Sequence, residues 1–289
     1  MNFKLQASHI FIKFLFLLSN NMLRLFRWLP HFKGKLRLGK VLFKRRINKN
    51  RAFEFTAHGN VKYKIPNTLE SLGVELLITG IYEKRVVKFL KNEMKQGDIY
   101  FDIGANIGSL ALPVLKNKVN IKYFGFEASP MVFDYLKYNF IKNNMKGYQL
   151  HNYLVHEFDN QSMKFYESVQ YGKSSLAPTY STSHVLVNSI ALDTFCNNHP
   201  VTKINWMKVD VQGFELFVFK GMQQLLLNKK VDNIIFEFEY WAEEAAGLEK
   251  GAAQKYLAAL GYELFDLNGK RLSAVLTTGR AMVWARQSK

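Results

Sequence analysis

The residues best suited to chemistry lie in one short run, where an apolar stretch ends in an acid and a tight glycine turn follows. Residues 97–108 read Gly-Asp-Ile-Tyr-Phe-Asp-Ile-Gly-Ala-Asn-Ile-Gly, and Asp102 ends the apolar part. Glycine lets backbone come close to a ligand, and a helix starting at such a turn offers free N–H groups. The run therefore predicts a cofactor site at the carboxyl end of a parallel strand. The turn residues expected to contact the cofactor are Gly104, Ala105, Asn106 and Gly108.

A second acid ends the next apolar stretch. Glu127 lies 23 residues after Gly104, the spacing at which an acid accepts hydrogen bonds from both ribose hydroxyls of an adenosine cofactor. Asp102 would lie where the pyrophosphate of NAD passes, and a carboxylate there suits a ligand with ammonium and sulfonium groups far better. The two acids together favour S-adenosylmethionine over NAD. The other residues expected at this cofactor are Ala128, Ser129 and Asn152, of which Ser129 also suits a helix N-cap.

Carboxylates also end the later strands, where they would face the same cleft. Asp210, at the end of the expected fourth strand, is the first choice for a general base. Glu237 or Glu239, at the end of the fifth, is the second, and His156 is a weaker third choice. Two such carboxylates suit a hard cation, yet the chain offers no ligand set specific enough to assign one. We therefore predict Asp210, Glu237 and His156 as catalytic residues and name no metal ligand.

From Glu70 onward, strand-like and helix-like patterns alternate, which predicts an α/β fold with a parallel sheet covered by helices on both faces. A hairpin is expected earlier, between 53 and 65, where two alternating stretches flank His58-Gly59-Asn60. The expected strands of the main sheet lie near 99–103, 122–127, 148–156, 206–210 and 233–238, with a closing pair at 262–267 and 281–285.

The first 50 residues differ from the rest, because they hold 12 Lys or Arg and no Asp or Glu. A helix over 9–29 would be apolar except for one stripe that includes Arg24 and Arg27, which suits the interface of an anionic membrane. Its apolar run is too short, and too interrupted by charge, for a signal peptide or a membrane span. The alternative is that this helix packs on its own domain.

These patterns predict three parts: a basic amphipathic helical extension over 1–50, a hairpin and linker over 51–69, and a cofactor-binding domain over 70–289. The single cysteine, Cys196, cannot form an internal disulfide, so we expect a reducing cytoplasm. Together with the basic extension, this places the protein in the cytoplasm and, as a peripheral protein, on the inner membrane face. Nothing in the pattern predicts an oligomeric state.

The chain resembles the FkbM family of methyltransferases from about Thr79 to Ala285. The resemblance rests on three segments: residues 101–108, residues 125–130, and residues 207–215, which read Met-Lys-Val-Asp-Val-Gln-Gly-Phe-Glu. It implies a class I, Rossmann-like methyltransferase sheet of seven strands, S-adenosylmethionine as donor and, usually, an oxygen as acceptor. One departure is Gln212, where the family commonly has glutamate. A carboxamide cannot serve as a base or an anionic ligand at neutral pH.

We therefore expect an O-methyltransferase that acts on a hydroxyl of a small molecule, glycan or lipid-linked sugar. Two alternatives stay open. The basic N-terminal region would also grip the phosphates of a nucleic acid, which an RNA methyltransferase needs. Gln212 also leaves room for a membrane-associated protein that binds S-adenosylmethionine without catalysis. Against methylation of base amino groups, no Asn-Pro-Pro-aromatic segment follows the fourth strand, where Asp210-Val211-Gln212-Gly213 stands instead.

Overall fold

The computed structural model describes residues 21–30, 32–116, 118 and 120–288. The chain divides into two compact units, with the boundary between Tyr82 and Glu83. This boundary differs from the expected one at residue 70, because helix α3 (Ser71–Thr79) packs with α2 (Lys35–Leu42) in the first unit.

The second unit is built on a seven-stranded sheet that is parallel apart from one strand, β12. Its order is β11 (Tyr262–Phe265), β12 (Arg280–Gln287), β10 (Val231–Glu239), β9 (Ile204–Val209), β3 (Ile99–Ile103), β4 (Lys122–Phe126), β5 (Tyr148–His151). The order reverses between β3 and β9, so the loops after these two strands open a crevice at the carboxyl edge. This arrangement confirms the α/β fold class and the seven strands expected for a class I methyltransferase.

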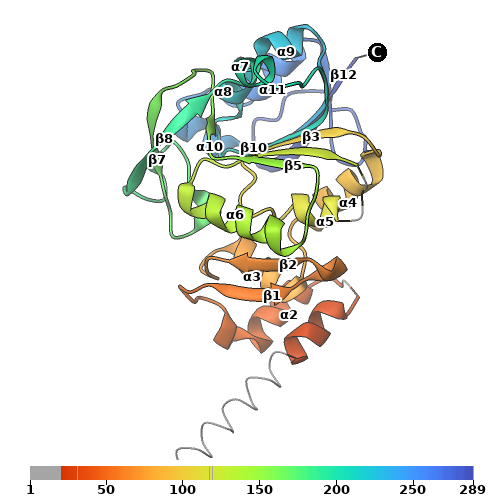
Figure 1. Ribbon diagram of the computed structural model, residues 1–289, viewed down its shortest axis with the longest axis vertical. Coiled ribbons are helices and arrows are strands. Elements are labelled where there is room, and N and C mark those ends of the chain that lie inside the picture. Colours follow the sequence, from red (N-terminus) through yellow and green to blue (C-terminus); the bar gives the residue numbers. More distant parts are fainter. Residues whose placement is uncertain (1–20, 31, 117, 119, 289) are drawn as a thin grey trace, which may run out of the picture. The chain divides into compact units, whose positions relative to one another are not determined.

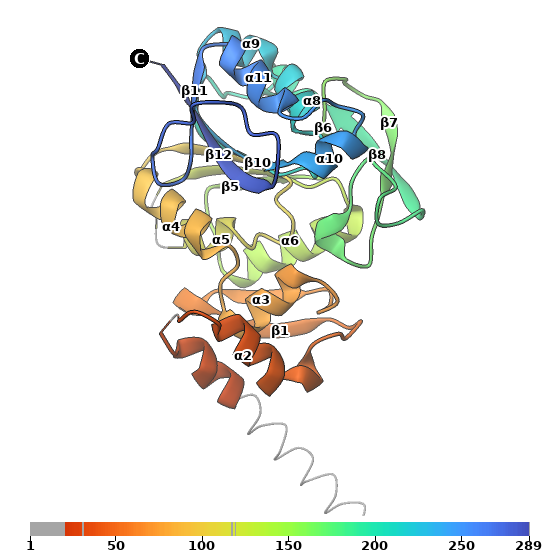
Figure 2. The same ribbon diagram turned by 180° about the vertical axis from the view of Figure 1, so that it is seen from behind.

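Helices cover both faces of this sheet, as Figures 1 and 2 show. One layer contains α4 (Lys84–Glu93), α5 (Ala111–Leu115) and α6 (Pro130–Lys142). The other contains α7 (Leu192–Asn197), α8 (Glu215–Lys220), α9 (Gln223–Leu227) and α11 (Ala252–Ala259), while α10 (Tyr240–Ala245) follows β10.

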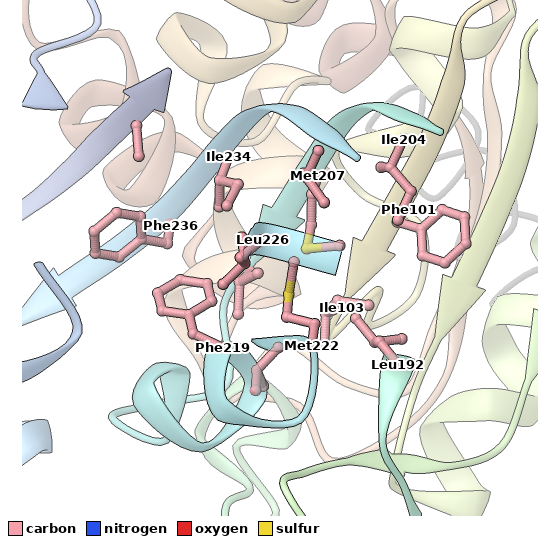
Figure 3. Close-up of a cluster of buried hydrophobic side chains, with 14 of the residues drawn as sticks. Phe101, Ile103, Leu192, Ile204, Met207, Phe219, Met222, Leu226, Ile234 and Phe236 are labelled. Carbon is pink, nitrogen blue, oxygen red and sulfur yellow. The ribbon is translucent and has the colours of Figure 1, made fainter. Parts of the chain in front are cut away.

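The main core lies between the second helix layer and the sheet. Met207 and Ile234 on the sheet pack against Phe219, Met222 and Leu226 of the helical segment, and all five side chains are buried (Figure 3). This packing holds strands β9 and β10 rigidly, and those two strands end in the acids that the sequence singled out.

A smaller sheet of order β6-β8-β7 interrupts the main fold and was not expected from the sequence. It consists of β6 (Leu154–Val155), β7 (Ser162–Tyr166) and β8 (His184–Ile190), with a single helical turn, η3 (Tyr171–Lys173), between the last two. The expected strand over 148–156 is therefore two strands that belong to different sheets, β5 and β6.

The first unit contains a helix over residues 21–28, α2, the single turn η1 (Lys44–Arg46), the hairpin β1 (Phe53–Thr56) and β2 (Lys62–Ile65) joined by η2 (His58–Asn60), and α3. The hairpin is paired as expected, with Phe53 opposite Ile65. Residues 21–50 are part of this unit's core instead of a separate extension, since Leu23, Phe26 and Phe43 are buried in it.

Arg27 does not lie on an exposed polar stripe of its helix, as the sequence predicted. It is only 6% exposed, and its guanidinium donates to the carbonyl oxygens of Leu77 and Thr56. The other part of the helix predicted over 9–29, up to residue 20, lies outside the described residues. Among those that are described, no helix combines the length and the apolar character that a bilayer span requires.

Candidate functional site

The turn after β3 brings three strand ends together. Gly104 has a φ of 73°, and a Cβ there would lie 2.0 Å from the carbonyl oxygen of Asp210, so only glycine fits. The N–H groups of Gly104 and Ala105 both donate to the carbonyl oxygen of Phe126, at 3.0 and 2.9 Å. The ends of β3, β4 and β9 are therefore joined by backbone contacts that a side chain at 104 would break.

Glu127 is the acid that reaches this turn. Its two carboxylate oxygens accept hydrogen bonds from the backbone N–H of Asn106, at 2.9 Å, and of Ser129, at 3.0 Å. Burial raises the pKa of Glu127 to about 7, although both N–H donors oppose that shift. The amide of Asn152 holds the same segment by donating to the carbonyl oxygens of Glu127 and Ala128. The structure thus gathers these predicted cofactor residues into one contact group.

Lys208 is a buried cation that the sequence reading did not assign to the site. Its ammonium donates to the carbonyl oxygen of Gly104 at 2.7 Å and lies 3.4 Å from Asp102 and 3.6 Å from Asp210. Burial lowers the pKa of Lys208, but the charges of the two aspartates outweigh burial and raise it above its ordinary value. Asp102 also accepts a hydrogen bond from the hydroxyl of Tyr123, at 3.0 Å. Lys208 thus ties the glycine turn to both acids.

A cavity opens in front of these strand ends. One wall is formed by strand-end residues of the main sheet, among them Gly104, Asn106, Glu127, Asp210 and Gln212. A second, largely aromatic and apolar part of the wall comes from the β6-β8-β7 region, with Tyr153, Leu154, Phe165, Tyr171 and Leu176. A ligand in this cavity would therefore meet both acids and rings.

Asp210 belongs to a small polar network at the edge of this cavity. The amide nitrogen of Gln212 donates to Asp210 at 2.9 Å and to Glu237 at 3.2 Å, so one carboxamide bridges two acids. Arg280 donates to the other oxygen of Glu237 at 2.5 Å. Burial and the charge of Asp210 raise the pKa of Glu237 to about 9. Burial opposes ionisation of Asp210 too, but Lys208 holds the pKa of Asp210 below its usual value.

The backbone of Gln212 is strained. Its φ is 56°, a conformation that is uncommon for a residue with a side chain, and the neighbouring Gly213 has a φ of 98°. A Cβ on Gly213 would lie 2.3 Å from the carbonyl oxygen of Ala242, so α10 packs directly on this turn. The turn therefore presents the Gln212 amide to both acids, and its buried Oε1 has no hydrogen-bond partner among the described residues.

A family model described as the methyltransferase FkbM domain matches residues 102–264. The chain belongs to the FkbM methyltransferase family. It is also 29% identical, over 188 residues, to the hexuronic acid methyltransferase AglP of Haloferax volcanii, an alignment that covers 64% of this chain and 73% of that protein. S-adenosylmethionine is accordingly the methyl donor of this enzyme.

Solved structures similar to this methyltransferase include a precorrin-6y C5,15-methyltransferase from Geobacter metallireducens, with 13% identity and a TM-score of 0.43. That match covers 81% of this chain and 94% of the other. A TehB-like S-adenosylmethionine-dependent methyltransferase from Corynebacterium glutamicum has 12% identity and a TM-score of 0.44, with coverage of 74% and 93%.

The residues that line the cavity suit the methyl donor chemically. Glu127 lines the cavity, and its carboxylate oxygens have lone pairs left for ribose hydroxyls, since each oxygen accepts one hydrogen bond from the backbone. Phe126, Leu154 and Val155 supply apolar surface beside it for a flat base. The tight turn at Gly104 brings backbone, instead of a side chain, to the cavity wall. Glu127, Asn106 and Gly104 are the residues that would hold the donor.

Several predicted site residues lie behind the cavity wall. Asp102 is 1% exposed and Glu237 is 5% exposed, and neither lines the cavity. Ala105 and Gly108 shape the turn, and Ser129 caps helix α6 by accepting from the N–H of Val132. Direct contact of these residues with the cofactor or the acceptor stays a prediction. No cluster of three or more metal-binding side chains occurs in the described part of the chain.

His156 lies outside the cavity wall. Its ring stacks on Phe217, with centroids 5.0 Å apart, and burial lowers its pKa. These contacts are those of a packing residue, so the structure gives no support to His156 as a base. The sequence analysis gave Lys208 no role at the site. One feature of the sequence could have indicated such a role, because Lys208 is a charged residue inside the apolar strand 204–209. No sequence pattern indicated the aromatic part of the cavity wall, because its residues come from short strands and turns.

Proposed function

We propose that this methyltransferase transfers the methyl group to a hydroxyl oxygen of a sugar. The observation that carries the proposal is the partly exposed carboxylate of Asp210 in the cavity wall, fixed by Gln212 on one oxygen and Lys208 on the other. The donor supplies an activated methyl group on a sulfonium, so the protein has to align a hydroxyl and take its proton. The name of the Haloferax volcanii relative, a hexuronic acid methyltransferase, supports a sugar as the acceptor.

Asp210 suits the proton-accepting role in a particular way. Because Lys208 holds its pKa below the ordinary value, Asp210 is ionised at neutral pH and can accept the hydroxyl hydrogen bond at once. Burial and the charge of Asp210 raise the pKa of Glu237, and Arg280 pairs with this acid, so a cation offsets a second negative charge beside Asp210. Gln212 positions both acids, since a glutamate in its place would add a third carboxylate to the pair.

A lysine and two aromatic rings close in sequence to cavity-lining residues support an acidic sugar as the acceptor. Lys173 lies between the cavity-lining residues Gly172 and Ser174, and its ammonium is 5.5 Å from the ring of Tyr180 and 5.6 Å from that of Trp241. Trp241 is next to Ala242, which packs on the turn at Gly213. Flat rings offer surface for the C–H face of a sugar, and an ammonium beside them offers a partner for a uronate carboxylate.

The proposal is tested with labelled donor and a panel of glucuronosides and glucosides, with the methylated position assigned by NMR. We expect Asp210→Asn to lower kcat by about a hundredfold while S-adenosylhomocysteine binding stays within about twofold. Asp232→Asn is the matched control, because Asp232 pairs with Lys203 at the opposite end of the sheet and leaves the cavity untouched. Equal losses of binding and turnover in Asp210→Asn would contradict the assigned role.

A second variant tests the acidic sugar separately. We expect Lys173→Met to raise KM for glucuronosides by about tenfold and to leave KM for any accepted glucoside unchanged, since only the uronate loses an ionic partner. Lys164→Met, on strand β7 of the same small sheet, is the matched control. Parallel increases in KM for both sugars would mean that Lys173 does not recognise the carboxylate.

A further inference from the structure

Two helices of the first unit each expose large apolar side chains. Six of these side chains are 44–68% exposed: Met22, Leu25, Trp28, Leu38, Val41 and Leu42. Three of them lie on the helix over residues 21–28 and three on α2, at spacings of three and four residues that return to one side of each helix. We call these six residues the apolar face.

The opposite sides of the same two helices are packed. Phe26 meets Phe43 with ring centroids 5.4 Å apart, and Leu23 is 2% exposed. A Cβ added to Gly39 would lie 2.9 Å from the ring of Phe26, so the two helices are in close contact. The inner sides therefore satisfy the unit's own packing, while the outer sides leave large apolar groups in water.

Exposed cations lie on, between and directly after the same two helices, namely Arg24, Lys33, Arg37, Lys40 and Lys44. Residues 1–50 contain 12 Lys or Arg and no acid, so no carboxylate of that segment compensates them. A segment that exposes both large apolar side chains and cations matches a layer with an anionic surface and an apolar interior.

We propose that the apolar face of the first unit binds the surface of an anionic lipid bilayer. The six side chains enter the boundary between headgroups and acyl chains, and the exposed cations pair with lipid phosphates. The helices lie in the plane of the membrane and do not cross it. RNA offers phosphates without an apolar layer, and a second copy of the chain brings the same positive charge, so the bilayer matches both features best.

The test compares two full-length variants that carry equally exposed substitutions. Leu25→Ser with Val41→Ser changes the apolar face, at 68% and 66% exposure. Ile141→Ser with Leu186→Ser is the matched control in the second unit, at 66% exposure for both. Sedimentation with phosphatidylcholine vesicles containing about 30% phosphatidylglycerol should weaken at least about tenfold for the first variant and not for the control. Both variants keep residues 1–20, so those residues cannot explain a difference.

Trp28 provides an internal reporter. Its fluorescence should shift to shorter wavelength on acidic vesicles, and Trp28→Phe should remove that shift, because the ring leaves water on binding. Undiminished sedimentation of the Leu25 and Val41 variant, or equal binding to vesicles of pure phosphatidylcholine, would overturn the proposal. So would a dimer in sedimentation velocity that only this variant dissociates, or binding to single-stranded RNA in the absence of any binding to vesicles.

Discussion

Two buried cations of this chain have different kinds of partner. In the second unit, the ammonium of Lys208 lies between two carboxylates, 3.4 Å from Asp102 and 3.6 Å from Asp210. In the first unit, the guanidinium of Arg27 donates to the carbonyl oxygens of Leu77 and Thr56, at 2.6 and 3.0 Å. Burial and the nearby Arg46 lower the pKa of Arg27 to about 10, whereas the aspartates raise that of Lys208.

The two pKa shifts differ because different groups surround the two cations. Around Lys208, opposite charges are matched at the strand ends, which keeps Asp210 ionised without leaving an isolated charge in the interior. Arg27 instead donates to backbone carbonyl oxygens, and it lies in a segment that has no acid before Glu54. One arrangement balances charge at the strand ends, and the other adds a cation to a segment that is already positive.

The largest expected effect is that of Lys208→Met. The substitution leaves Asp102 buried without its cation, so we expect a loss of about 3–5 kcal/mol in the free energy of unfolding at neutral pH. Urea denaturation measures this loss, which should shrink when Asp102→Asn is added, because the amide carries no charge. A loss below about 1 kcal/mol would show that water reaches Asp102, and that the pair with Lys208 is not a buried one.

Arg27→Met should have a smaller effect. Two carbonyl oxygens lose their donors, but no opposite charge is stranded, so we expect a loss of about 1–3 kcal/mol. The same urea experiment measures it, and Arg24→Met, an exposed position on the same helix, is the matched control with little change. If Arg27→Met lowers the free energy of unfolding as much as Lys208→Met does, the different partners of the two cations do not change their contribution to stability.

Glu127 should make cofactor affinity depend on pH. Its folded-state pKa of about 7 lies above the ordinary 4.5, so the folded protein holds an extra proton between these values, and folding is favoured less as pH rises through 7. Ribose hydroxyls prefer the ionised carboxylate as acceptor. We therefore expect S-adenosylhomocysteine binding to weaken by up to about tenfold for each pH unit below 7. Calorimetry should show a flat profile for Glu127→Gln, and a flat wild-type profile would contradict the ribose role.

Local patterns predicted the parts of the site that depend on single strands and turns. Gly104, Glu127 and Asp210 each end a strand, and parallel strands bring their carboxyl ends to one edge, so these three residues meet in the cavity wall. The role of Lys208 depends on register. Asp102 pairs with Lys208 across β3 and β9, two strands that are far apart in the sequence, and no local pattern encodes that alignment.

The polar stripe predicted for the N-terminal helix was wrong at Arg27, for a different reason. Helical spacing shows which residues share a side, but it does not show whether that side points inward or outward. Arg27 was grouped with Arg24 on a polar stripe, yet Arg27 is buried because backbone carbonyls of β1 and α3 receive it. Leu25, read as part of an apolar side, is 68% exposed. Which side faces inward depends on the hairpin and on α3, which the sequence reading treated as separate parts.

The smallest expected effect is that of substitutions in the apolar face, which we compare with a substitution on the packed side of the same helix. Without lipid, Leu25→Ser with Val41→Ser should change the free energy of unfolding by no more than about 0.5 kcal/mol, because both side chains already lie largely in water. Leu23→Ala, on the packed side of the same helix, should cost about 2–5 kcal/mol. Urea denaturation of both proteins checks this difference. A large loss in the serine variant would mean that Leu25 and Val41 stabilise the unit itself, and exposed leucines would then need no membrane to explain them.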